Sequence, residues 1–157
     1  MGYSYSNNLK NKIYKDLILI FIMGAAYMVL EGIWRGWTHI SMLVVGGLAA
    51  FLIGRLNEYT KFYDSKMWQE CVIGTLIILI LEFTSGMILN VWLGLGIWDY
   101  SGEPFNFYGQ ICLPYALLWF LLVPVCVYLD DYLRYKIFGE KKPDGILKNY
   151  TDLITGN

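Results

Sequence analysis

The sequence predicts an all-α membrane protein, a four-transmembrane-helix bundle with both ends on the cytoplasmic side. Long segments carry no charged side chain, and the Lys and Arg residues of the chain are distributed unevenly among the segments that connect them. The chain has 157 residues, of which 57% are hydrophobic and 16% charged. An average soluble domain carries roughly 25% charged residues, so this composition favours a bilayer over water as the surrounding medium.

Four apolar segments define the predicted spans. A helix needs about 20 residues to cross roughly 30 Å of hydrocarbon. Segments of about that length lie at residues 16–35, 39–56, 69–93 and 110–132, together forming a transmembrane domain over 16–132. The second is the shortest, and the first two should form a tight hairpin. Residues 1–15 form an N-terminal segment, and 133–157 form a tail with too little apolar content for a second domain.

The distribution of basic residues predicts the orientation. Lys and Arg stay cytoplasmic when they lie in short connecting segments. Eleven of them fall before the first span, between the second and third, or after the fourth: Lys10, Lys12, Lys15, Arg55, Lys61, Lys66, Arg134, Lys136, Lys141, Lys142 and Lys148. The other side has Arg35 alone. We therefore predict cytoplasmic N- and C-terminal segments (1–15 and 133–157), an outer loop at 94–109, and a multi-pass protein of the cell (cytoplasmic) membrane surrounded by lipids.

Several function classes find no support in the sequence. The net charge of −1 and the absence of a Lys and Arg cluster argue against a nucleic-acid partner. A single histidine and three cysteines without paired spacing predict no metal site. No recognised catalytic or phosphate-binding motif is present, so we assign neither catalytic residues nor a cofactor. Any dependence on ATP would require a separate ATPase subunit, for example one docking on the loop at 57–68.

Two acids within the spans are candidates for a substrate or proton path. Glu31 and Arg35 stand four residues apart on the first span, where a carboxylate and a guanidinium can pair. Glu82 lies twelve residues after Glu70, about 18 Å along a helix and near the middle of the bilayer. An acid there costs on the order of 2.5 kcal/mol or more unless it is paired, protonated or solvated.

Ser85 and Asn90 extend a polar stripe from Glu82 along the third span. Such a stripe should face other helices or a water-filled cavity. Either it belongs to a path for a solute or proton, with Glu31 and Arg35 reaching in, or it is a buried polar link that fixes helix packing. The sequence leaves these two interpretations equally open.

Small residues predict close contacts between helices. Gly46, Ala50 and Gly54 recur every four residues on the second span. Small side chains at this spacing let helix backbones approach closely in lipid. The contact can lie within the chain or between the subunits of a homo-oligomer.

The loop after the third span resembles the signature of a known family. Its residues include Trp98, Asp99, Tyr100, Ser101, Pro104, Phe105, Asn106, Gly109, Ile111, Cys112 and Leu113. In that order they resemble the pattern Trp-Asp-Tyr-Ser, Pro-Phe-Asn, Gly-x-Ile-Cys-Leu of a bacterial family of ABC-transporter type IV, permease-like membrane proteins. Glu31 with 34–35, and Glu82 with 83–85, resemble two further parts of its pattern, and the likeness covers about 24–128.

The resemblance implies a permease-like subunit that moves a small solute, either alone or together with a separate ATPase. It also singles out Trp98, Asp99, Tyr100, Pro104, Asn106 and Gly109 as an outer-loop signature, which we interpret as a folded lid. Two alternatives stay open. The chain could be a membrane-embedded enzyme acting on a lipid or isoprenoid, with Glu31, Glu82 and Asp99 as candidate acids. It could also be a structural or regulatory membrane protein without transport activity.

Overall fold

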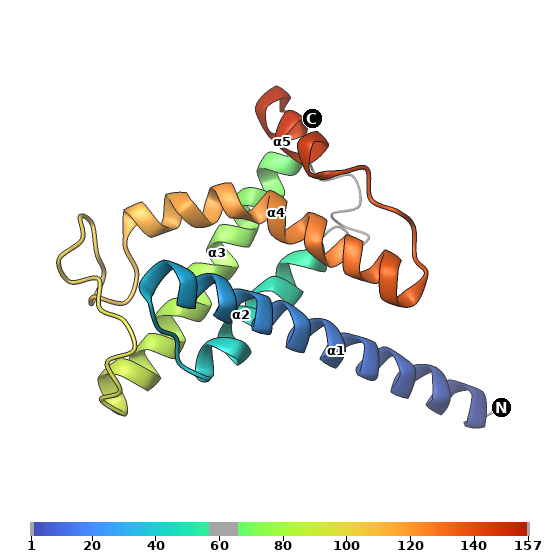
Figure 1. Cartoon of the computed structure of the whole chain (residues 1–157), viewed down its shortest axis with the longest axis horizontal. Helices are drawn as coiled ribbons and strands as arrows, with labels where there is room; N and C mark the ends of the chain where they lie inside the picture. The colour runs from blue at the N-terminus through green and yellow to red at the C-terminus, as the bar shows by residue number, and fades with distance from the viewer. Residues whose placement is uncertain (1, 57–65, 157) are drawn as a thin grey trace. The chain divides into compact units, whose positions relative to one another are not determined.

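The computed structural model describes residues 2–56 and 66–156, and every regular element in that part is helical. Outside the helices, Phe107 and Ile111 form an isolated antiparallel bridge. The elements are α1 (Gly2–Arg35), α2 (Ser41–Gly54), α3 (Met67–Gly86), the π-helix η2 (Met87–Trp92), α4 (Leu113–Phe138) and α5 (Ile146–Thr155). Figure 1 shows them in chain order. The all-α prediction is confirmed for these residues.

Three described helices are long and apolar enough to cross a membrane. They are Lys10–Arg35, Met67–Trp92 and Leu113–Phe138, each with 26 residues. The predicted second span corresponds to α2, whose 14 residues extend about 21 Å at 1.5 Å per residue. This length falls short of roughly 30 Å of hydrocarbon. The structure thus supports three of the four predicted spans by length and composition, and α2 as a shorter apolar helix.

The chain divides into two compact units, Met1–Phe51 and Leu52–Asn157. In the first unit, α1 ends where Gly36 adopts a φ of 79°, and the N–H of Gly36 donates to the Gly32 carbonyl at 2.9 Å. A left-handed residue of this kind, usually glycine, commonly ends a helix. After a short turn, α2 begins where the N–H of Ser41 donates to Nδ1 of His39 at 3.2 Å.

Backbone packing in the first unit depends on glycines. A Cβ atom at Gly24 would collide with the carbonyl oxygen of Leu43, and one at Gly47 with that of Ile20. Gly46 lies against the ring of Tyr27 in the same way. The close helix contact predicted for this region is therefore present, although Gly24 and Gly47 make the backbone approach.

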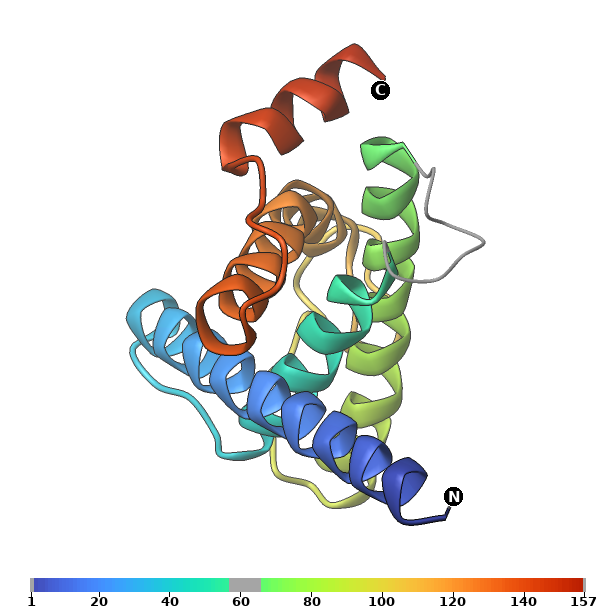
Figure 2. The ribbon, with the colours of Figure 1, turned by 90° about the vertical axis from the view of Figure 1, so that its right-hand side faces the viewer.

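The second unit is built on the pair α3 and α4. Figure 1 shows α4 crossing α3, and Figure 2 shows the two helices side by side. The loop lies at one end of α3 and α5 at the other (Figure 1). The core lies where the two helices meet and contains Ile53, Cys71, Val123 and Val127. Gly74 permits this contact, because a Cβ there would come within 2.9 Å of the Val123 side chain.

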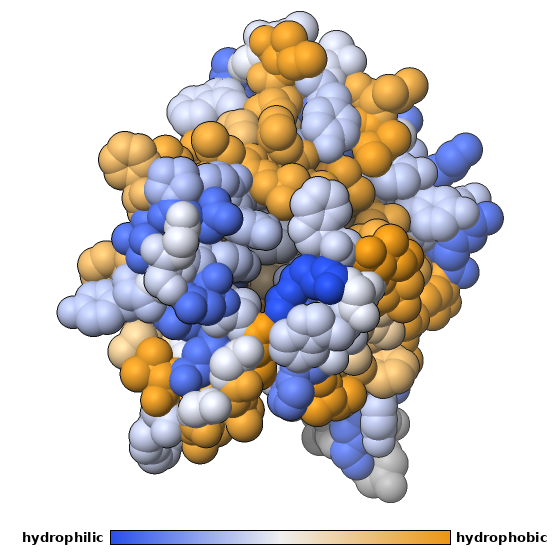
Figure 3. All heavy atoms as spheres, turned by 60° about the vertical axis from the view of Figure 1, so that its left-hand side comes forward, coloured by the Kyte–Doolittle hydropathy of each residue, from blue (hydrophilic) through white to orange (hydrophobic). Residues whose placement is uncertain are grey.

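Large apolar side chains cover much of the outside. On α3, Val72, Leu76 and Ile80 follow one another every four residues and are 42%, 53% and 61% exposed. Figure 3 shows apolar side chains over much of the visible surface. Exposed apolar surface of this extent marks contact with lipid or with another protein. Together with the helix lengths, it indicates insertion into a membrane.

Candidate functional site

The buried carboxylate of Glu82 forms the centre of the candidate site. Glu82 lies on α3, fifteen residues after Met67 and therefore about 22 Å from the start of the helix. Its side chain is 8% exposed. Nε1 of Trp119, on α4, donates to Oε2 of Glu82 at 3.1 Å. The acid is thus hydrogen-bonded across the contact between the two long helices.

Asn90 continues the polar stripe and connects η2 to the loop. Its Nδ2 donates to Oε1 of Gln110 at 2.9 Å, while its Oδ1 accepts from the N–H of Ile97 at 2.7 Å. Asn90 lies inside the π-helical segment. Such segments are rare and are found frequently at functional sites. Ser85, by contrast, donates its hydroxyl to the carbonyl of Leu81, 2.5 Å away on the same helix.

Gln110 is a central residue that the sequence-based site prediction missed. It is buried, and its side chain lies where a Cβ at Gly86 would collide with it. Its Nε2 donates to the carbonyl of Tyr108 at 3.0 Å, and its own carbonyl accepts from Nε1 of Trp98 at 3.1 Å. The signal available in the sequence was its position as a polar amide at the start of the predicted fourth span. We call the group Glu82, Gly86, Asn90, Gln110 and Trp119 the Glu82 seam.

The loop signature residues form a closed, internally hydrogen-bonded turn. Asp99 Oδ1 accepts from the N–H of Ser101 at 2.8 Å and also from its hydroxyl. The Tyr100 N–H donates to the Gly109 carbonyl at 2.8 Å. Asn106 Nδ2 donates to the Ser101 carbonyl at 3.1 Å, and its Oδ1 accepts from the N–H of Gly109 at 3.3 Å. Pro104 is exposed at the tip of this turn.

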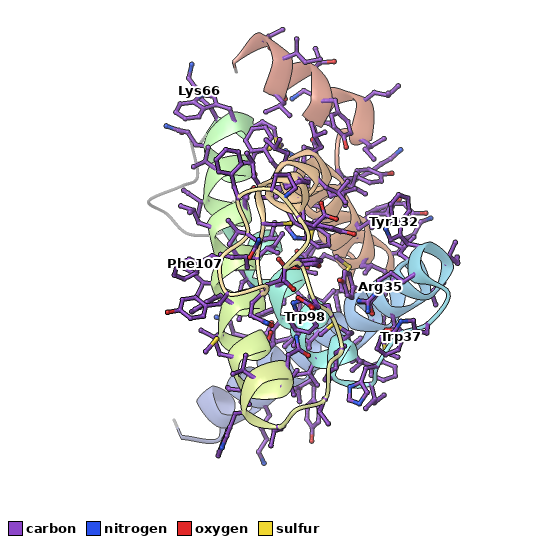
Figure 4. The ribbon with its side chains drawn as sticks, turned by 90° about the vertical axis from the view of Figure 1, so that its left-hand side faces the viewer. Arg35, Trp37, Lys66, Trp98, Phe107 and Tyr132 are labelled. Atoms are coloured by element: carbon purple, nitrogen blue, oxygen red, sulfur yellow. The ribbon has the colours of Figure 1, made fainter. Side chains whose placement is uncertain are left out.

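The loop folds back along α3. Phe107 packs against Phe83 with ring centroids 5.2 Å apart, and Tyr108 packs against the same ring at 6.4 Å. Figure 4 shows Phe107 beside α3 and Trp98 within the loop. The returning segment therefore contacts α3 at Phe83, and through Gln110 it also reaches Gly86 and Asn90. Tyr108 has a φ of 53° without being glycine, which is backbone strain of a kind that often occurs near functional sites.

Comparison with known families identifies the chain. The sequence model of a family described as "Putative ABC-transporter type IV" matches residues 17–146. This stretch includes the Glu82 seam, the loop and both long helices of the second unit. The chain belongs to this family. No solved structure matches it.

The ion pair predicted between Glu31 and Arg35 lies in the first unit. Arg35 Nη1 donates to Oε1 of Glu31 at 2.6 Å, and the Thr38 hydroxyl donates to Oε2 of the same carboxylate. The guanidinium also lies 4.9 Å from the ring centroid of Trp37. Glu31 and Arg35 therefore come together as their spacing predicts. They belong to the unit Met1–Phe51, whereas the Glu82 seam belongs to Leu52–Asn157.

A buried ion pair in the second unit is a further feature that the sequence-based site prediction missed. Asp130 and Arg134 on α4 are 0% and 2% exposed, and Arg134 Nε donates to Oδ2 of Asp130. Gly54 lies directly against the Asp130 carboxylate, so that a Cβ there would collide with it. Arg134 served in the sequence interpretation as a marker of the cytoplasmic side. In the sequence, the four-residue spacing of Asp130 and Arg134 was the signal that could have indicated this pair.

Residues able to hold a metal are not grouped in the described part of the chain. No three His, Cys, Asp or Glu side chains within residues 2–56 and 66–156 come close enough together to bind an ion. The arrangement of the Glu82 seam instead offers a carboxylate, two amides and an indole. These groups can bind a proton, a cation or a neutral hydrogen-bonding solute.

The loop of this family member should open under acid conditions. The hydroxyl and N–H of Ser101 lower the pKa of Asp99 from its ordinary value of 3.8. Because the folded-state pKa is depressed, the stabilisation is present above pH 3.8 and is lost as the pH falls through the folded-state value. Pepsin should therefore cleave residues 99–109 increasingly below that pH. Asp99→Asn should remove this pH-dependent step, and an unchanged acid profile in the variant would refute the assignment.

Proposed function

We propose that this ABC-transporter type IV protein is a multi-pass, permease-like membrane subunit that moves a small solute along the Glu82 seam. The observation that carries the proposal is a carboxylate buried in a long apolar helix and hydrogen-bonded to a second such helix. Ionisable groups inside a membrane are costly, and they commonly mark ion pathways and proton relays. Membership of a transporter-type family also supports a transport function.

The backbone around the seam adds a second argument. Non-helical backbone at membrane depth is tolerated where it is buried in protein or lines a water-filled cavity. The segment 106–112 is non-helical up to the start of α4 and runs beside the apolar end of α3 and η2. Its amide partner Asn90 and the neighbouring carboxylate of Glu82 give this segment a polar lining. Such an arrangement suits a short path for a solute.

The charges around the seam favour a proton or another cation as the solute. Between residues 67 and 133 the sequence contains no Lys, Arg or His. The same stretch contains the acids Glu70, Glu82, Asp99, Glu103, Asp130 and Asp131. A region lined by one sign of charge concentrates ions of the opposite sign and repels like ions. An anionic solute would find no cationic side chain within this stretch, although its Asp130 is paired with a cation, Arg134, that follows directly after it.

The proposal includes the predicted topology and partners. α2 would act as the short second of four spans, and both termini would lie in the cytoplasm, as the positions of the basic residues indicate. ATP-driven transport would need an ATPase subunit encoded separately, and a homo-oligomer would enlarge the path. The predicted docking loop at 57–68 lies for the most part outside the described residues, because these resume at Lys66.

Flux in native membrane vesicles tests this function. Vesicles would be prepared from cells that contain the chain, from a deletion strain and from the complemented strain, each loaded with ATP and a pH-sensitive dye. We expect proton or monovalent-cation flux above the deletion background, and no chloride flux attributable to the chain. Equal cation flux in all three vesicle preparations, with and without ATP, would contradict a transport role.

A structural role is the second candidate, and one observation favours it. Both the Glu82 carboxylate and the Asn90 amide have hydrogen-bond partners within the chain, as a packing link requires. On this alternative the seam would be dry, and substitutions there would change stability and leave flux unaffected.

A further inference from the structure

Helix α5 reaches from the C-terminal tail to the middle of α4. The hydroxyl of Tyr150 donates to the carbonyl of Leu121 at 2.7 Å. Nδ2 of the adjacent Asn149 donates to the carbonyl of Pro124 at 3.1 Å. Side chains from the tail therefore bind two backbone carbonyls of an apolar helix, 25 and 29 residues earlier in the sequence.

Both carbonyls belong to the turn of α4 that contains Pro124. Pro124 lies inside α4 and has no N–H, so the carbonyl of Phe120 loses its intrahelical donor. Groups freed in this way are commonly satisfied by neighbouring side chains. The two α5 donors bind the carbonyls of Leu121 and Pro124, one and four residues after Phe120 in the same stretch of α4. Burial also raises the pKa of Tyr150, which keeps its hydroxyl protonated and able to donate.

A second attachment holds α5 at the beginning of α3. Lys66 Nζ donates to the carbonyl of Gly156, just after α5, at 2.8 Å. Figure 4 shows Lys66 at the end of α3 nearest to α5. Leu153 packs against the core that contains Cys71 and Val123. The helix is thus fastened to α3 and to the middle of α4.

Docking and helix formation of α5 should be coupled. The helix has ten residues, whereas isolated helices shorter than about 12–15 residues are marginal in water. The preceding segment begins with Gly139 at a φ of 70° and ends with Gly145 at a φ of 120°. Glycine at both ends gives this connection freedom to adopt other conformations. An undocked α5 would therefore lose its helical structure.

We propose that α5 is a reversible strap that holds the turn of α4 around Pro124. Leu121, the acceptor of Tyr150, lies two residues after Trp119, which binds Glu82. Release of the strap would loosen α4 next to the Glu82 seam and expose the core beneath α5. The strap itself is independent of the proposed transport function, and only its effect on the solute path rests on that function.

Native cysteines report on the strap in the full-length chain. Cys71 lies in the core beneath α5, whereas Cys112 is buried at the loop end of α4. We would measure the rates at which N-ethylmaleimide modifies both thiols in lipid nanodiscs by mass spectrometry. Tyr150→Phe and Asn149→Leu each remove one donor to α4. Thr151→Val is the matched control, since this hydroxyl bonds to Leu147 within α5.

We expect each strap variant to raise the modification rate of Cys71 relative to Cys112 by about threefold to tenfold, the range for one lost hydrogen bond. The Thr151→Val control should leave the ratio unchanged. A ratio in the strap variants equal to that of the control would overturn the proposal. Equal acceleration of both thiols would also overturn it, since that result means general loosening. Because no flux is measured, either result is independent of whether the chain transports.

Discussion

Replacing Arg134 by methionine should destabilise the protein by about 3–5 kcal/mol, the usual cost of breaking a buried ion pair from one side. Asp130 and Arg134 are almost fully buried on α4, and Gly54 lies against the carboxylate. Removing the guanidinium would take the cation of Arg134 away from the buried Asp130 carboxylate, and also from Glu140, whose Oε2 lies 3.9 Å from Arg134 Nη1. The effect should appear as a lower thermal unfolding temperature in detergent.

The double variant Asp130→Leu/Arg134→Met distinguishes the loss of the charge interaction from a simple loss of side-chain packing. Exchanging both charges of a buried pair for apolar groups is often neutral or stabilising. The double variant should therefore recover most of the stability lost by Arg134→Met. Lys136→Met, at an exposed position two residues further along α4, is the matched control and should have little effect. Similar losses in the single and double variants would show that the charges are not coupled.

Replacing Glu82 by glutamine should reduce proton or cation flux about a hundredfold, within the range attributed to a positioned proton-transferring side chain. Glutamine has nearly the same shape, and its carbonyl oxygen can still accept from Trp119 Nε1. The fold should therefore persist, while a charged or protonatable group is lost from the seam. Flux in complemented vesicles, normalised to the amount of chain, measures the effect.

Glu103→Gln provides the matched control for this substitution. Glu103 is an exposed acid in the loop and lies outside the Glu82 seam. Its replacement removes one negative charge from the same stretch and should change flux by less than about threefold, as expected for a screened surface charge. If Glu82→Gln retained full flux and unfolded at a lower temperature, the acid would be a packing link.

The helical segments could be predicted from sequence because a long apolar run can adopt few stable structures in lipid. In lipid, the backbone N–H and C=O groups must form their hydrogen bonds within the segment, so a long apolar stretch forms a helix. The runs at 69–93 and 110–132 accordingly correspond to α3 with η2 and to α4. The family resemblance carried by the loop is confirmed by a match over residues 17–146. The second run proved shorter as a helix, Ser41–Gly54, because His39 and Ser41 form its start.

The partners within the site could not be predicted in the same way. Glu82 and Trp119 are 37 residues apart, and Asn90 and Gln110 are 20 apart. Their meeting depends on how the loop folds back, which no helical periodicity encodes. The same holds for α5, whose ten residues gain their place from contacts with Leu121 and Pro124. A tail that reads as polar in sequence thus provides an attachment to the apolar helices.

Water access to Ser85, which lies on α3 between Glu82 and Gly86 of the seam, tests the central claim most directly, because it separates a solute path from a packing link. Cys71, Cys112 and Cys126 would first be replaced by alanine, and single cysteines introduced as Ser85→Cys, Ser101→Cys or Leu76→Cys. A charged, membrane-impermeant thiol reagent would then be applied to vesicles of both orientations. We predict that Ser85→Cys reacts from at least one side, more slowly than the loop position 101 and faster than the apolar-face position 76. No reaction at position 85 from either side, as at position 76, would show a dry seam and contradict the proposed path.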